Sequence, residues 1–275
     1  MTDLLGSGPI RKMISELKSP VAYTLPLGDA RVAMNPLVGT MLTMRFSWRI
    51  LCVACGRETK KSFNQGYCFP CFRSLAECDL CVMRPETCHF HLGTCRDPAW
   101  AEDHCMQSHV VYIANSSGLK VGITRGSQIP TRWIDQGATQ AVPVFRVKSR
   151  FHSGLIESAL KKHVSDRTDW RRMLKGANPI EDLAASAKSI VETASADMEG
   201  LNDGQGVLQP VRLDESVVEI EYPVVEYPEK VSSLNFDKTP EVRGLLQGIK
   251  GQYLILDGGV INMRKFTGYE VELSI

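Results

Sequence analysis

The sequence predicts an α+β protein made of several small modules, and three observations carry that prediction. All nine cysteines of this 275-residue chain lie between Cys52 and Cys105, which marks one compact cysteine-rich module. Strand-like and helix-like patterns alternate after this module, and strand-like patterns dominate the last quarter of the chain. With 43% hydrophobic and 23% charged residues, the chain has enough apolar side chains for each module to bury a core.

The N-terminal segment, residues 1–51, ends in a pattern with a period of two. Apolar and polar side chains alternate here, which is typical of a half-buried strand. The apolar members are Leu42, Met44, Phe46, Trp48 and Ile50. We expect this strand to be able to pair with the C-terminal β domain.

Residues 52–108 form the predicted cysteine-rich module, whose first half carries two CxxC pairs. Twelve residues separate the pair Cys52 and Cys55 from the pair Cys68 and Cys71. Four thiolates presented in this way match the tetrahedral coordination of a structural zinc ion, which leaves no open catalytic position. Disulfides are the first alternative, and an intracellular setting disfavours them. A redox CxxC is the second, and one pair would suffice for it.

The second half of the module has more candidate ligands than one metal ion needs. A third pair, Cys78 and Cys81, is followed by Cys88 and Cys95. These four cysteines are the predicted ligands of a second structural zinc, with His91 and Cys105 as substitutes. Packed, metal-free thiols stay an alternative for some of them, including Cys88 and Cys105.

Residues 109–200 form the third predicted module, which begins with a β-hairpin. The segments 110–114 and 119–124 are strand-like and flank the turn residues Asn115–Gly118. A short helix from Pro130 to Gly137 and a strand over 142–147 follow.

Two longer helices complete this module in the prediction. Apolar spacing predicts a helix over 153–165. Asn178, Pro179 and Glu181 are start signals for a second helix that runs to about Glu199. The glycine-containing segment 202–206 is the predicted linker to the last module.

Two short motifs in the third module resemble the paired motif of the GIY-YIG nuclease superfamily. They are Val110-Val111-Tyr112 and, after seven residues, Lys120-Val121-Gly122. Arg132 follows ten residues after Gly122, and Glu157 lies on the next substantial helix, as in that superfamily. The resemblance covers about 55 to 65 residues. The chain as a whole resembles an uncharacterised family of double zinc-knuckle proteins.

The resemblance implies a GIY-YIG-like small sheet with helices and a phosphodiester-cleaving site. By this resemblance Tyr112 helps to activate water, Arg132 holds the phosphate, and Glu157 binds Mg²⁺ or Mn²⁺. Two positions depart from the pattern. Lys120 replaces the second-motif tyrosine, and Gln136 stands where histidine is common, so a glutamine there can orient water but cannot transfer a proton.

Residues 207–275 are predicted to form a C-terminal all-β domain. Strand-like segments cover 217–222, 253–256 and 260–263. Asp257, Gly258 and Gly259 supply a hairpin turn between the last two.

Charge is strongly segregated, although the whole chain carries a net charge of only +1. Residues 109–175 contain twelve basic and four acidic side chains, whereas residues 176–275 contain eight and seventeen. A compact basic segment is typical of proteins that bind phosphate, so DNA or RNA is the predicted partner. Its candidate phosphate-binding residues are Arg125, Arg132, Arg146, Lys148, Arg150, Lys161, Lys162, Arg171 and Arg172, with Lys60 and Lys61 as an extension and Trp133 and Trp170 as stacking surfaces.

Three classes of function stay open at this point. The protein is a metal-dependent endonuclease, a non-catalytic reader of nucleic acid on the same fold, or a zinc-stabilised scaffold whose acidic part meets a protein partner. No apolar run reaches the roughly 18 to 20 residues of a membrane helix, and the start lacks an export pattern. We therefore expect a cytoplasmic protein without a membrane partner.

Overall fold

The computed structural model describes residues 3–176, 180, 182–204 and 206–275, which form two compact units. Unit 1 contains Met1–Arg73, Leu174–Gly176 and Ile220–Ile275, and unit 2 contains Ser74–Met173 and Ala177–Glu219. These units differ from the predicted modules, and Leu174–Gly176 of the predicted third module belong to unit 1. The cysteine-rich module is divided after Arg73, and residues 207–219 belong to unit 2 rather than to the C-terminal β domain.

Unit 1 consists of two antiparallel sheets. The larger has six strands in the order β1-β14-β5-β11-β12-β13, and the smaller has the order β2-β3-β4. Their bounds are β1 Leu4–Pro9, β2 Ile14–Glu16, β3 Ala22–Leu27, β4 Ala30–Ala33, β5 Met41–Ile50, β11 Glu241–Lys250, β12 Tyr253–Leu256, β13 Gly259–Asn262 and β14 Tyr269–Ser274. The short helices of unit 1 are η1 Asn35–Leu37 and η6 Met263–Phe266, and α1 Phe69–Ser74 ends one residue beyond it.

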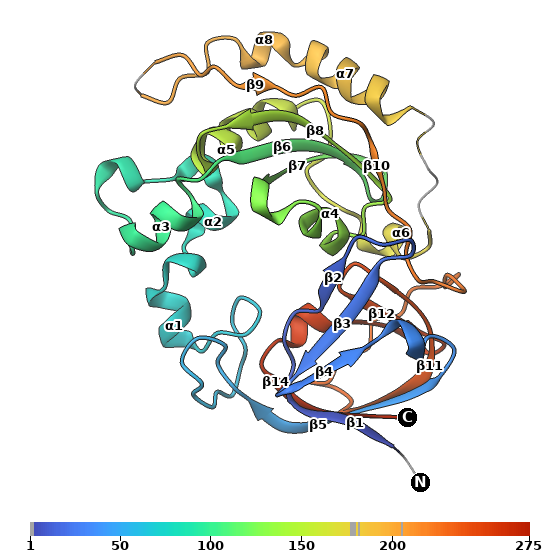
Figure 1. The fold of residues 1–275 in the computed structure, drawn as a ribbon. Helices are drawn as coiled ribbons and strands as arrows, with labels where there is room; N and C mark the ends of the chain where they lie inside the picture. The colour runs from blue at the N-terminus through green and yellow to red at the C-terminus, as the bar shows by residue number, and fades with distance from the viewer. Residues whose placement is uncertain (1–2, 177–179, 181, 205) are drawn as a thin grey trace. The chain divides into compact units, whose positions relative to one another are not determined.

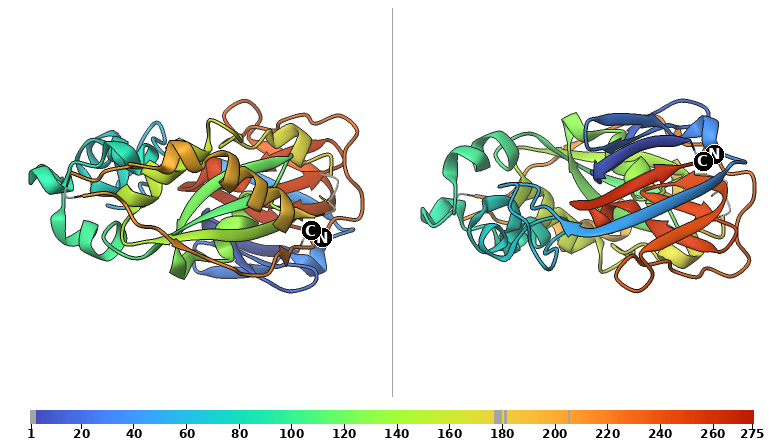
Figure 2. Two further views of the ribbon diagram at one scale, coloured as in Figure 1. Left: turned by 90° about the horizontal axis from the view of Figure 1, so that it is seen from above. Right: turned by 90° about the horizontal axis from the view of Figure 1, so that it is seen from below.

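The predicted strand β5 is the centre of the larger sheet, where it pairs with β11 and β14. Figure 2 shows this light-blue strand beside the red C-terminal strands. Leu42, Met44 and Phe46 are buried as the alternation predicts. Trp48 is instead 66% exposed, because its backbone has φ +65° and breaks the alternation.

Unit 2 is built on a five-stranded antiparallel sheet, whose strands β6, β7 and β8 are green and β9 and β10 orange in Figure 1. The strand order is β10-β8-β6-β7, and β9 also pairs with β8. The bounds are β6 His109–Asn115, β7 Leu119–Arg125, β8 Gln140–Val147, β9 Val211–Arg212 and β10 Val218–Glu219. The predicted hairpin is therefore β6 and β7, with Tyr112 directly opposite Gly122.

Three helices pack on the two faces of this sheet. Alternate side chains of β6, such as Val111 and Ile113, join a hydrophobic core with α5 (Arg150–Leu160) and α7 (Leu183–Thr193). Tyr112 contacts α4 (Thr131–Asp135) on the other face, where its ring meets Trp133 edge-on. Because successive side chains of a strand alternate, one strand supplies both the core and a polar site.

The helix boundaries differ from the predictions in ways that capping explains. Helix α5 begins after Ser149, whose hydroxyl accepts a hydrogen bond from the backbone N–H of His152, and it ends at Leu160. Helix α7 begins after Asp182, which caps it in the same way. The predicted start signals Asn178, Pro179 and Glu181 lie outside the described residues.

The predicted linker over 202–206 lies within unit 2. Asn202 and Val207 form a β-bridge, and the Asp203 carboxylate lies 2.9 Å from Nε2 of His152. The described part of this segment is therefore a turn, from which the chain returns to pair β9 and β10 with β8.

The other helical segments of unit 2 are short. They are η2 Ala76–Cys78, α2 Leu80–Met83, η3 Pro85–Thr87, η4 Phe90–Leu92, α3 Pro98–His104, η5 Gly126–Gln128, α6 Trp170–Met173 and α8 Ser195–Met198. Among the described residues, the helices fall short of the length and apolarity needed to cross a bilayer.

Candidate functional site

The first cysteine cluster follows directly from the end of β5 in unit 1. Cys52 and Cys55 lie on the turn after this strand, Cys68 precedes α1, and Cys71 lies within it. The four Sγ atoms all lie within 4.8 Å of one another. Four sulfurs about 2.3 Å from a tetrahedral zinc ion lie about 3.8 Å apart, and the Sγ atoms of Cys55 and Cys68 are 3.8 Å apart. These four close cysteines fit a zinc site.

Backbone amides already favour a thiolate in this cluster. The N–H of Cys68 donates to Sγ of Cys52 at 3.2 Å. Burial by itself raises the pKa of the Cys52 thiol, but hydrogen bonds from the backbone of Cys68, Cys55 and Ala54 lower it to about 6. The donor set, its spacing and its hydrogen bonds therefore all fit a closed structural site.

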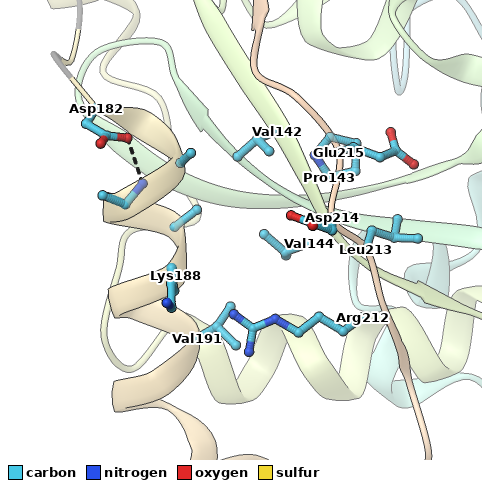
Figure 3. Close-up of a pocket in the computed structure, with 13 residues that line it drawn as sticks. Val142, Pro143, Val144, Asp182, Lys188, Val191, Arg212, Leu213, Asp214 and Glu215 are labelled. Atoms are coloured by element: carbon cyan, nitrogen blue, oxygen red, sulfur yellow. Dashed lines mark hydrogen bonds between the residues drawn. The ribbon is translucent and has the colours of Figure 1, made fainter.

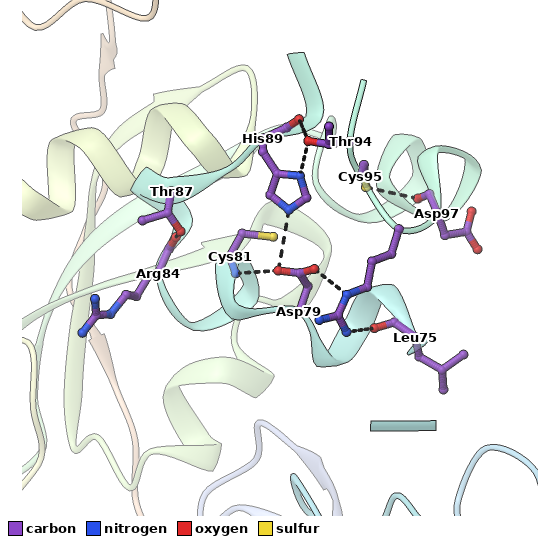
Figure 4. A network of polar contacts seen from close by, with 10 residues as sticks. Leu75, Asp79, Cys81, Arg84, Thr87, His89, Thr94, Cys95 and Asp97 are labelled. Carbon is purple, nitrogen blue, oxygen red and sulfur yellow. Dashed lines mark hydrogen bonds and ion pairs between the residues drawn. The ribbon is translucent and has the colours of Figure 1, made fainter. Parts of the chain in front are cut away.

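The second cysteine-rich region, in unit 2, is organised around Asp79. Figure 4 shows its carboxylate between the backbone N–H of Cys81, which it accepts at 3.2 Å, and the ring of His89, whose Nε2 lies 3.6 Å away. Asp79, Cys81 and His89 offer atoms within 4.8 Å of one another. Among the described residues, neither the predicted ligand set of Cys78, Cys81, Cys88 and Cys95 nor a set that includes Cys105 forms such a group.

The third candidate site centres on Tyr112 of β6, which is fully buried. Its ring lies over Gly122 on the neighbouring strand, where a Cβ atom would be only 2.5 Å from the tyrosine oxygen. The Tyr112 hydroxyl donates to Oε1 of Gln136 at 2.9 Å. Glycine at position 122 therefore has a physical reason: any side chain there would displace the tyrosine.

Arg132 also reaches the Tyr112 hydroxyl from α4. Burial raises the pKa of Tyr112 to about 12, while Arg132 and Gln136 act in the opposite direction by favouring the phenolate. Tyr112 is thus protonated at neutral pH and able to donate a hydrogen bond rather than to accept a proton.

Lys120, on the same face of the hairpin, is also buried. Its Nζ donates to Oγ1 of Thr168 at 3.3 Å. Burial lowers its pKa to about 8, and Arg132 adds to this, while Glu157 and Asp166 raise it. A lysine with this pKa is partly neutral near pH 8 and is suited to proton transfer.

Glu157 on α5 completes the set. Burial raises the pKa of its carboxyl to about 6, and Asp166 adds to this, whereas Lys161, Lys120 and Arg150 lower it. Two carboxylates that interact electrostatically match the oxygen ligands that Mg²⁺ and Mn²⁺ prefer. The residue types present therefore fit a divalent metal ion.

The structure thus brings Tyr112, Lys120, Arg132, Gln136 and Glu157 within electrostatic or hydrogen-bonding reach of one another. Sequence reasoning did not find Asp166 and Thr168. They reach the site because the segment after α5 lies along β7, where Ser165 accepts a hydrogen bond from the backbone N–H of Val121. A segment without regular structure gives no periodic signal in the sequence.

The predicted phosphate-binding surface is only partly available. Trp133 is buried, so the prediction that it stacks on bases is wrong. Arg146 lies 3.8 Å from Glu215, and Lys162 pairs with Asp197. Trp170 remains partly exposed, with the Arg171 guanidinium 4.2 Å from its ring centroid.

A separate hollow of about 600 Å³ lies between α7, β8 and the segment 211–215 (Figure 3). Lys188 and Arg212 border it together with acidic side chains such as Glu215. Among the described residues that line it, none belongs to the set around Tyr112. Its mixed charges and the alanine-rich face of α7 give it no defined ligand chemistry.

Comparisons with known proteins place the chain in a family without assigning it an activity. No curated protein and no solved structure matches it. The model of the family described as "Protein of unknown function (DUF2797)" matches residues 39–271. This match spans both cysteine regions and the set around Tyr112, and the chain therefore belongs to that family.

Proposed function

We propose that this protein binds DNA or RNA and hydrolyses a phosphodiester bond at the site formed by Tyr112, Lys120, Arg132, Gln136 and Glu157. The observation that carries the proposal is the convergence of these five side chains, at which the resemblance to the GIY-YIG superfamily places a phosphodiester-cleaving site. Zinc at the first cysteine cluster has a structural role in this proposal.

Each member has a role that its environment supports. Arg132 supplies a fixed positive charge for a phosphate oxygen, and Lys120 is the candidate base because its pKa is lowered to about 8. Glu157 would hold Mg²⁺ or Mn²⁺, which neutralises charge that develops on the phosphate. Gln136 orients the hydroxyl of Tyr112, to which it is hydrogen-bonded.

One observation favours a second candidate, a reader that binds nucleic acid without cutting it. Tyr112 is fully buried, and its pKa of about 12 makes it a poor base at neutral pH. If Lys120 does not replace that function, the site retains phosphate-binding groups but lacks water activation.

The deciding experiment compares wild type with Glu157→Gln on labelled DNA and RNA, single- and double-stranded, with Mg²⁺ or Mn²⁺. Glu192→Gln is the matched control, because Glu192 is an exposed residue of α7 and the substitution removes the same charge. Cleavage by wild type and the control, but not by Glu157→Gln, supports the nuclease. Salt-sensitive binding without cleavage under either metal identifies the reader. The absence of both overturns the proposal and favours a protein-interaction scaffold.

Loss of activity in Glu157→Gln should not reflect unfolding. Burial raises the carboxyl pKa to about 6, so the folded state loses stability as pH rises from about 4.5 through 6. At pH 7 we expect the glutamine variant to have a free energy of unfolding about 1–2 kcal/mol above wild type. Urea denaturation measures this directly, and a destabilised variant would contradict it.

A further inference from the structure

Four cysteines of unit 2 line one small enclosed cavity that the proposed function does not use. They are Cys81, Cys88, Cys95 and Cys105, and the cavity has a volume of about 20 Å³. A space of this size accommodates about one water molecule or one ion. Cys78, by contrast, is buried on η2 and is not among the described residues that line the cavity.

The four thiols come from separate short elements that the fold brings together. Cys81 lies in α2, Cys88 follows η3, Cys95 precedes α3, and Cys105 ends that helix. The three elements α2, η3 and α3 therefore place the four thiols around one cavity. Their Sγ atoms do not all lie within 4.8 Å of one another, so a bound zinc ion would draw them together.

The competing donor set of Asp79, Cys81 and His89 is already engaged. One Asp79 oxygen accepts the N–H of Cys81 and faces His89, and the other lies 2.7 Å from Nε of Arg96. This carboxylate therefore caps α2 and holds Arg96, which leaves it poorly placed to bind a metal ion.

The largely buried guanidinium of Arg150 lies beside the cavity. Arg150 donates to the carbonyl oxygen of Val82 at 2.5 Å, and its backbone N–H donates to that of Cys105 at 2.7 Å. Its Nε is buried, and within the described residues this atom has no hydrogen-bond partner. The Glu157 carboxylate interacts favourably with this guanidinium, and a second anionic neighbour would offset more of the cost of burying it.

We propose that Cys81, Cys88, Cys95 and Cys105 bind a second structural zinc ion, and that this centre adds a second anionic neighbour for Arg150 beside Glu157. A zinc ion with four thiolates carries a net charge of minus two, and its formation releases the four thiol protons. Cys105 takes the place that the sequence assigned to Cys78.

The centre would also hold the helix that carries Glu157. Arg150 is the first residue of α5, and η3 packs so closely on this helix that a Cβ atom on Gly154 would lie 2.6 Å from Cβ of Pro85. Zinc would therefore fix α2, η3 and α3 against the start of α5, and it would position Glu157 without touching it.

Zinc content of the purified full chain tests the proposal. We expect two zinc ions per chain in wild type and in Cys78→Ser, and one in Cys105→Ser and in Cys88→Ser. The Cys78→Ser variant is the matched control, since it removes a buried thiol from the same region. One zinc in wild type, or loss of an ion from Cys78→Ser but not from Cys105→Ser, overturns the proposed ligand set.

A second measurement uses wild type alone, in case a serine variant does not fold. We would replace zinc with ¹¹³Cd and record its NMR spectrum, in which the chemical shift depends on the number of sulfur ligands. Two resonances from all-sulfur sites support the proposal. A single resonance, or one from a site with nitrogen or oxygen ligands, overturns it.

Discussion

Lys250 is a buried lysine whose ammonium group loses its hydration in the folded state. It lies at the end of β11 in unit 1, is fully buried, and has no hydrogen-bond partner for its Nζ among the described residues. The Nζ atom is 5.2 Å from the ring centroids of both Tyr222 and Tyr227. Two cation–π contacts recover only part of the hydration that an ammonium group loses on burial. The pKa is accordingly lowered to about 8.

We expect Lys250→Met to raise the free energy of unfolding at pH 7 by about 1–3 kcal/mol. Since the unfolded lysine binds its proton up to about pH 10.5, wild-type stability should rise as pH increases from about 8 towards 10.5, and the advantage of the variant should shrink. Urea denaturation at pH 7 and pH 9 measures both effects. Lys238→Met, at an exposed position, is the control and should change little. A less stable Lys250→Met at pH 7 would show that the tyrosine contacts outweigh the burial.

At the residue scale, the sequence predicted functional residues where their spacing along the chain determines their geometry. The four cysteines from Cys52 to Cys71 were predicted from spacing alone, because two CxxC turns determine their own local geometry. Asp166, Thr168 and the buried state of Lys250 could not be predicted. The position of these residues depends on contacts with segments that are distant in the sequence, and the local sequence pattern does not reveal such contacts.

Among the elements, η3 and α5 pack closely against each other at Gly154. Glycine inside a helix is ordinarily about 1 kcal/mol less favourable than alanine, so Gly154 needs a reason. A Cβ atom at this position would lie 2.6 Å from Cβ of Pro85 and 2.7 Å from the backbone nitrogen of Glu86. The close approach of these two elements supplies the reason.

We therefore expect Gly154→Ala to lower the free energy of unfolding by about 1–3 kcal/mol, despite the better helix propensity of alanine. Ser158→Ala, on the same helix, makes a smaller gain in propensity and adds no Cβ atom, so it should be neutral or stabilising. Thermal or urea denaturation of both variants gives the comparison. Stabilisation by Gly154→Ala would mean that η3 can move away from the helix at little cost.

Strands with a strong apolar periodicity were predicted correctly, whereas strands that depend on pairing with a distant segment were not. The hairpin of β6 and β7 follows from two apolar runs around a turn, and β5 follows from strict alternation. The two-residue strands β9 and β10 both pair with β8. The sequence predicted no strand at β9, and it assigned the strand over 217–222, which contains β10, to the C-terminal domain. Trp48 breaks the alternation because its backbone has a positive φ, which cannot be predicted from a tryptophan in the sequence.

In the molecule as a whole, the fold brings together basic and acidic segments that are separate in the sequence. Unit 2 contains the basic segment 109–175, yet its residues include fifteen basic and nineteen acidic side chains. The acidic part contacts the basic part directly. Asp197 pairs with Lys162 and lies 2.7 Å from Nε2 of His163, and Glu215 approaches Arg146. These exposed pairs contribute little stability, but each withholds a cation from phosphate.

The double variant Asp197→Asn with Glu215→Gln should therefore bind nucleic acid more tightly than wild type. Lys162 and Arg146 become available, so the plot of log affinity against log salt should steepen by about one unit for each freed cation that contacts phosphate. A titration at several salt concentrations measures both quantities. Glu229→Gln with Glu226→Gln removes the same charge at exposed positions without freeing either cation, so its binding should stay close to wild type. Equal gains in both double variants would mean that net charge, rather than these two cations, governs binding. Unchanged binding in the first would place the nucleic acid away from this face.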